Sequence, residues 1–247
     1  MTLFENFVSR VGAAQKQVQA ERQVWDLPVR VFHWSLAGAF VAAFVTNKLG
    51  VRFFKYHVWA GYAVLVLASF RILWGLVGTR HALFWNFLRG PRETLAYVAD
   101  LVKRREAHYP GHNPLGALMV LALLGGMLAQ AAFGLFANDE IFNVGPLYGY
   151  VAKDVSLVLT SIHRQLFYWL AGAVALHVGA VVAHKVFKNE NLVRAMVTGR
   201  KPLESVPVGE GIHSSRLWLA LPLAIALTAA LVWIVTHAPA AADSGEF

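Results

Sequence analysis

The chain has 247 residues, of which 57% are hydrophobic and 15% are charged, and its formal net charge is +8. Soluble domains carry roughly 25% charged residues, so the composition excludes an ordinary soluble protein and indicates a polytopic membrane protein. The lack of cysteine excludes disulfides, iron–sulfur clusters, thiolate zinc sites and covalent haem attachment through Cys-x-x-Cys-His. Basic cytoplasmic loops explain the net charge better than nucleic-acid binding does.

The N-terminal segment, residues 1–24, lacks the apolar core of a signal peptide. Its apolar residues recur at helical spacing, at Leu3, Phe4, Phe7, Val8 and Val11. This spacing predicts an amphipathic helix on the cytoplasmic membrane surface, with a flexible tail as the alternative.

Five apolar segments are long enough to cross a bilayer, which needs about 20 residues. In chain order they are Val31–Asn47, His57–Val77, Pro114–Phe136, Ile162–Lys188 and Leu217–Thr236. Between them, Trp85–Lys103 predicts an interfacial helix, and Ala137–Ser161 predicts a long, partly apolar loop. We therefore expect an all-α membrane protein: a four-helix transmembrane bundle, a fifth C-terminal transmembrane helix and the N-terminal amphipathic segment.

The distribution of basic residues predicts the orientation. With the N-terminus inside, sixteen of the 22 Lys and Arg residues lie on the cytoplasmic side, five lie outside, and Arg71 lies within the second span. Lys48, Arg52 and Lys55 oppose the trend. We expect a multi-pass protein of the bacterial inner membrane with a periplasmic C-terminus.

Ionisable residues inside a membrane span mark functional sites, and the fourth span contains His163 and His177. Their separation of 14 residues is just under four turns, so both rings project from one face, about 21 Å apart. In the predicted topology His57 lies at the depth of His163, and His33 at the depth of His177. Each pair is expected to clamp one iron as a bis-histidine haem b site, a low-spin arrangement that suits electron transfer.

Three features of the sequence each allow two interpretations. His184 lies seven residues after His177 and by depth alone competes with it as the partner of His33. Arg71 either snorkels to the cytoplasmic interface or neutralises a propionate of the inner haem. The glycines of the third span either allow close helix packing or make room for a porphyrin edge.

Several motifs together resemble a known family. They are WDLPVRVFHW at Trp25–Trp34, HVWAGY at His57–Tyr62, RILWG at Arg71–Gly75, GHNPLG at Gly111–Gly116 and HVGAVVAHKVFKNENLVRAMVTGRK at His177–Lys201. The resemblance is to the bacterial cytochrome b561 and nickel–iron hydrogenase cytochrome b subunit family, whose members are four-helix di-haem proteins that exchange electrons with quinone. It implies His33, His57, His163 and His177 as ligands, and favours His177 over His184.

The resemblance also implies a function and a division of the chain. Residues 25–201 would form the di-haem domain, and residues 202–247 a linker, the fifth helix and a short outer tail. The two haems would carry electrons between the quinone pool and a periplasmic partner, either a c-type cytochrome or a hydrogenase-like enzyme subunit. An electron-transfer subunit is favoured over a complete enzyme. A stand-alone oxidoreductase such as a superoxide:quinone reductase and a haem-free membrane anchor are the alternatives, and a homo-oligomer is left open.

Overall fold

The computed structural model describes residues 21–103, 105 and 109–239. Five of its helices are long and apolar enough to cross a membrane, which confirms an all-α membrane protein. They are α2 (Leu27–Lys48), α3 (Phe54–Val77), α6 (Pro114–Leu135), α7 (Lys153–Lys188) and α9 (Leu217–Thr236). Most of the predicted amphipathic segment lies outside the described residues.

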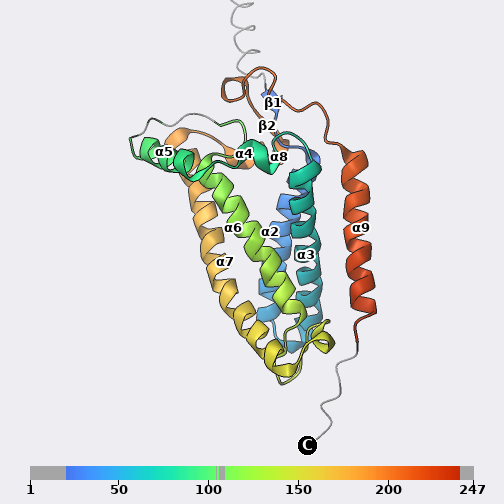
Figure 1. Ribbon diagram of the computed structural model, residues 1–247. Coiled ribbons are helices and arrows are strands. Elements are labelled where there is room, and N and C mark those ends of the chain that lie inside the picture. The colour runs from blue at the N-terminus through green and yellow to red at the C-terminus, as the bar shows by residue number, and fades with distance from the viewer. Residues whose placement is uncertain (1–20, 104, 106–108, 240–247) are drawn as a thin grey trace, which may run out of the picture.

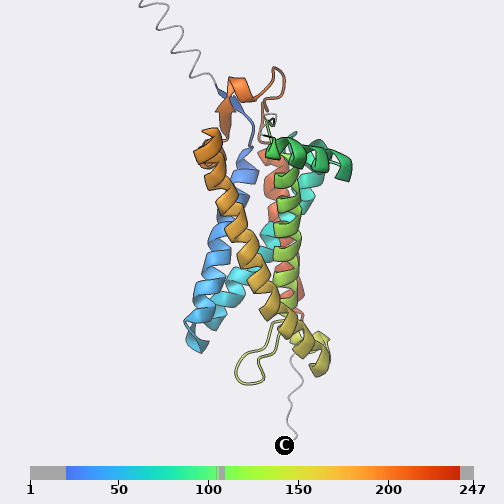
Figure 2. The same cartoon turned by 90° about the vertical axis from the view of Figure 1, so that its left-hand side faces the viewer.

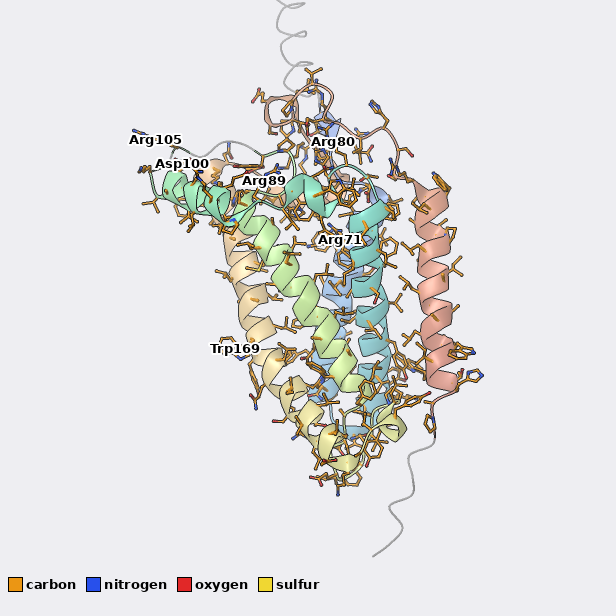
Figure 3. The ribbon with its side chains drawn as sticks, in the orientation of Figure 1. Arg71, Arg80, Arg89, Asp100, Arg105 and Trp169 are labelled. Atoms are coloured by element: carbon orange, nitrogen blue, oxygen red, sulfur yellow. The ribbon has the colours of Figure 1, made fainter. Side chains whose placement is uncertain are left out.

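The first four of these helices form the bundle, and α9 stands beside α3 at its edge (Figure 1). Within the bundle, α3 packs against α2 and α6, and α6 packs against α7. Figure 2 shows α7 crossing the bundle obliquely. Many large apolar side chains point away from the bundle, such as Trp169, which is 78% exposed (Figure 3). Such a surface suits lipid rather than water.

Short elements cover one end of the bundle, hereafter the inner end (Figure 1). They include α5, which lies across the helix ends. The set comprises β1 (Glu21–Gln23), α4 (Phe84–Phe87), α5 (Pro91–Val102), α8 (Leu192–Thr198), β2 (Arg200–Pro202) and the 3₁₀ turn η3 (Leu203–Ser205). The predicted interfacial helix is thus two helices, because the proline at position 91 begins a new helix instead of continuing one.

Strands β1 and β2 pair antiparallel and join the segment before α2 to the segment after α7. Gly199 helps to make this junction, since its carbonyl accepts hydrogen bonds from the amides of Val24 and Trp25 at 2.8 and 3.1 Å. Its φ of +80° favours glycine, and a Cβ atom there would lie 2.6 Å from the Trp25 carbonyl oxygen. Residues 21–23 therefore belong to a strand, not to the predicted amphipathic helix.

Helix α2 begins four residues before the predicted span, because Asp26 caps it. The Asp26 carboxylate accepts from the amide of Val29 at 2.6 Å and from Trp74 Nε1 at 3.0 Å, and also from the Thr79 hydroxyl. This buried carboxylate ties the start of α2 to the end of α3.

The opposite, outer end holds two 3₁₀ turns, η1 (Val51–Phe53) and η2 (Tyr148–Tyr150), and the loop between α6 and α7. The predicted loop over Ala137–Ser161 is wrong in its second part, because α7 begins at Lys153. With 36 residues, α7 is about 54 Å long, well beyond the roughly 30 Å of a hydrocarbon layer. The Ser156 hydroxyl donates to the Phe136 carbonyl at 2.6 Å, which fixes this first part of α7 to the loop.

Candidate haem-binding sites

The outer histidine pair consists of His57 in the first turns of α3 and His163 in α7. Their ring centroids lie 6.1 Å apart, with the ring planes at 88°. An imidazole nitrogen binds a transition metal at about 2 Å, which puts the metal roughly 3 Å from the ring centroid. Two axial imidazoles on one iron therefore have centroids about 6 Å apart, which is the spacing seen here.

Hydrogen bonds orient both rings of the outer pair. Nδ1 of His57 lies 2.8 Å from the carbonyl oxygen of Ala43 on α2, and Nδ1 of His163 lies 2.8 Å from that of Gln130 on α6. Because a carbonyl only accepts, each Nδ1 carries the hydrogen. Each Nε2 then keeps its lone pair for a metal, as in many histidine-ligated metal sites.

A cavity of about 300 Å³ adjoins the outer pair and is lined by both histidines. Gly61, one turn after His57, also lines it, and a Cβ atom on Gly61 would meet nothing within 4 Å. Arg164, Asn47 and Asp139 contribute polar groups to its wall. The space therefore has an apolar interior with polar groups that include an arginine.

Gln130 was not among the predicted site residues. It is the only polar side chain in α6 apart from the helix cap, and this is the signal that could have identified it. Its Nε2 lies 3.5 Å from Nε2 of His163, and its Oε1 is buried without a hydrogen-bond partner among the described residues. The Gln130 side chain therefore lies at the Nε2 edge of His163, the edge that would face a bound metal.

The third-span glycines serve different purposes. A Cβ atom on Gly126 would lie 2.6 Å from Leu170, so this glycine allows α6 and α7 to pack closely. A Cβ atom on Gly134 would lie 2.9 Å from Cε1 of His163, so this glycine makes room for the histidine ring. Gly125 faces open space.

The inner histidine pair consists of His33 in α2 and His177 in α7. Their ring centroids lie 6.3 Å apart, with the planes at 54°. Unlike the outer rings, His33 has a buried Nδ1 with no hydrogen-bond partner among the described residues. The structure thus brings together the residues that equal depth paired in the sequence, and their ligand role stays a prediction.

Arg71 lies inside the bundle near its inner end and is only 3% exposed (Figure 3). Its guanidinium lies 5.2 Å from the ring centroid of Phe84, and Nη1 and Nη2 are buried without a partner among the described residues. A snorkelling arginine would reach polar surroundings with its terminal nitrogens. Arg71 is therefore a buried cation without a hydrogen-bonded anion among the described residues.

His184 is not part of the contact between His33 and His177. Its Nδ1 donates to Oε2 of Glu190 at 3.2 Å, and Oε1 of Glu190 accepts from Lys201 at 2.9 Å. The hydrogen bond from His184 lowers the pKa of Glu190 to about 2 against the effect of burial, and Lys201 adds to the shift. His184 therefore belongs to an ion-paired cluster that joins α7 to β2.

Comparisons with known proteins identify the family of this chain. The sequence profile of the family described as Prokaryotic cytochrome b561 matches residues 24–199. The chain belongs to the prokaryotic cytochrome b561 family. It is therefore a multi-pass membrane b-type cytochrome that uses haem b for transmembrane electron transfer.

Curated relatives of this cytochrome b561 family member carry one description, "Probable Ni/Fe-hydrogenase B-type cytochrome subunit". The protein of Rhodobacter capsulatus is 26% identical over 214 residues, which cover 72% of this chain and 80% of the relative. That of Azotobacter vinelandii is 24% identical over 237 residues, which cover 81% of this chain and 96% of the relative. The similarity thus extends over most of both chains.

The residues present fit haem in this cytochrome b561. A bare metal ion needs three or four protein ligands, and the described residues contain no cluster of three or more His, Asp or Glu side chains that could hold one. A macrocycle supplies four nitrogens itself and needs only the two imidazoles that each histidine pair offers. The buried unpaired nitrogens of Arg71 are the donors that a haem propionate requires.

Proposed function

We propose that the protein carries electrons across the membrane through two haem b groups, one at each histidine pair. His57 and His163 would bind the outer haem, and His33 and His177 the inner haem. The observation that supports this most strongly is the centroid spacing of 6.1 and 6.3 Å in the two pairs, which suits one iron between each pair of rings.

Each haem supplies an iron that accepts and releases one electron. The chain would hold each haem through two imidazoles, and such bis-histidine binding would favour electron transfer over oxygen chemistry. The carbonyls of Ala43 and Gln130 hold the outer rings in the tautomer that binds metal. Arg71 would neutralise a propionate of the inner haem.

Quinone is the proposed exchangeable substrate, and its exchange is proposed at the inner end. His184, which lies beside Glu190, is a group there that offers hydrogen bonds and protons. The inner end carries most of the basic residues, which supports a cytoplasmic location for it in the bacterial inner membrane, with the C-terminus periplasmic.

The outer partner is proposed to dock near Val51–Tyr56 and the loop over residues 137–152. The names of the relatives support a hydrogenase-like subunit, and a c-type cytochrome is the second candidate. A stand-alone quinone oxidoreductase is a further candidate, distinguished by activity of the isolated chain with quinone.

Haem content and single-site variants test the proposal. The purified protein should contain two haems b per chain, and His177→Ala should lose one of them while His184→Ala keeps both. His184 serves as the matched control because it lies on the same helix and bonds to Glu190. Loss of a haem only in His184→Ala would overturn the pairing, and a colourless, folded protein would instead support a haem-free anchor.

A further inference from the structure

Two unpaired donors lie together at the inner end of the bundle. One is the guanidinium of Arg71, whose Nη1 and Nη2 have no partner among the described residues. The other is His112, whose Nδ1 is likewise buried and unpaired. The ring of Phe87 connects them, since its centroid lies 6.0 Å from the Arg71 guanidinium and 4.9 Å from the His112 ring.

Among the described residues, no carboxylate forms a hydrogen bond with the Arg71 terminal nitrogens. Asp26 is the carboxylate that acts on Arg71 electrostatically. Its oxygens are already engaged by the Val29 amide, the Trp74 indole and the Thr79 hydroxyl. Glu190 is engaged by His184 and Lys201. A buried guanidinium without an anion is costly, so an anion from outside the chain would stabilise Arg71.

His112 is suited to be a neutral donor beside that anion. Its ring lies between Trp25, at 4.8 Å, and Phe87, at 4.9 Å. Burial lowers the pKa of His112 to about 3, and the positive charge of Arg71 adds to the shift. The ring is therefore neutral near pH 7 and offers one N–H without adding a second buried charge.

The inner histidine pair identifies the ligand. His33 and His177 act electrostatically on His112, so the three rings lie in one region of the inner end. A haem between His33 and His177 would carry propionate carboxylates at its edge. An arginine fork and one imidazole N–H in an aromatic enclosure match one carboxylate. Resting on the haem placement proposed above, we propose that Arg71 and His112 together bind one propionate of the inner haem.

The test uses the full-length protein in nanodiscs in a His57→Ala background, which should retain only the inner haem. The readout is the rate at which apomyoglobin removes that haem. Arg71→Gln should raise the rate at least about tenfold, since charge-assisted hydrogen bonds are lost. His112→Phe, which keeps the ring packing, should raise it several-fold, and His112→Gln should restore part of the retention. Arg92→Gln, at an exposed position of α5 at the inner end, is the matched control and should leave the rate of haem release unchanged.

Haem dimethyl ester, which lacks free propionate carboxylates, provides the second arm. The protein with Arg71 and His112 intact should release the ester about as fast as the variants release haem. The variants should release the ester no faster than the intact protein does. Equal haem release from all forms would overturn the proposal. So would variants that weaken quinone binding while haem release is unchanged, because the donors would then serve quinone. A protein that binds no haem with all its histidines intact would instead refute the proposed function itself.

Discussion

Gly134 lies so close to His163 that a Cβ atom on it would come within 2.9 Å of the ring's Cε1 atom. The missing side chain of α6 is what lets the His163 ring reach the Gln130 carbonyl. A residue without a side chain thus determines where a histidine of α7 points, and this relationship can be tested directly.

Gly134→Ala should displace the His163 ring and weaken haem binding at the outer pair. The overpacking is expected to cost about 1–3 kcal/mol of stability. Haem content and thermal denaturation of the purified protein measure the two effects. Gly125→Ala on the same helix is the control, because a Cβ atom there meets nothing within 4 Å. Equal haem content and equal thermal stability of the two variants would show that the His163 ring does not require a glycine at position 134.

Asp26→Asn should destabilise the junction between α2 and α3. The asparagine amide would face the Trp74 and Thr79 donors, leaving a buried hydrogen bond unmade at a cost of about 1–3 kcal/mol. Thermal denaturation in detergent checks this, with the exposed Asp154→Asn as the control. An unchanged midpoint would mean that the network contributes little.

The stability of the inner end should fall as the pH is lowered. His112 has a pKa of about 3 in the folded protein, against 6.5 for an unperturbed histidine. Between these values the unfolded chain binds a proton that the folded chain does not, so stability is lost as the pH falls below 6.5. His112→Phe should therefore reduce the loss of thermal stability between pH 7 and pH 4. The exposed His213→Gln should keep the full pH dependence, and an identical profile for His112→Phe would contradict the assignment.

Glu190→Gln should loosen the connection between α7 and β2. It leaves the Lys201 ammonium, which is 3% exposed, without its carboxylate partner. The expected cost is about 1–2 kcal/mol, less than for a fully buried pair because Glu190 is partly exposed. Faster hydrogen exchange in residues 189–202 would report the loosening. Glu204→Gln, at an exposed position nearby, should leave the exchange unchanged.

The bundle was predictable because its helices are long, apolar and well separated. Leu217–Thr236 has the same bounds in the sequence and in the structure. The first nine residues of α7 were missed because Lys153, Asp154 and Ser156 interrupt the apolar run, so hydropathy did not extend the predicted span to them. The pairing of β1 with β2 was missed because each strand has only three residues and no sequence pattern links the two.

The relative depths of the histidines could be read from the sequence because helix geometry is regular. The surroundings of those histidines could not. No pattern in the sequence marks His112, and only the packing of Trp25 and Phe87 against it reveals a half-buried ring with a buried Nδ1. The hydrogen bonds to Ala43 and Gln130 likewise depend on how neighbouring helices rotate, which no local pattern determines.

Helix α7 contributes one histidine to each pair, and the partners lie on α2 and α3. Ribosomes make the chain from its N-terminus, so α2, α3 and α6 are synthesised before α7. Under the proposed ligation, neither iron can gain its second axial ligand until His177 and His163 have entered the membrane. Cofactor loading then becomes a late step of biogenesis, and a nascent chain that stops before α7 would hold neither haem by two histidines.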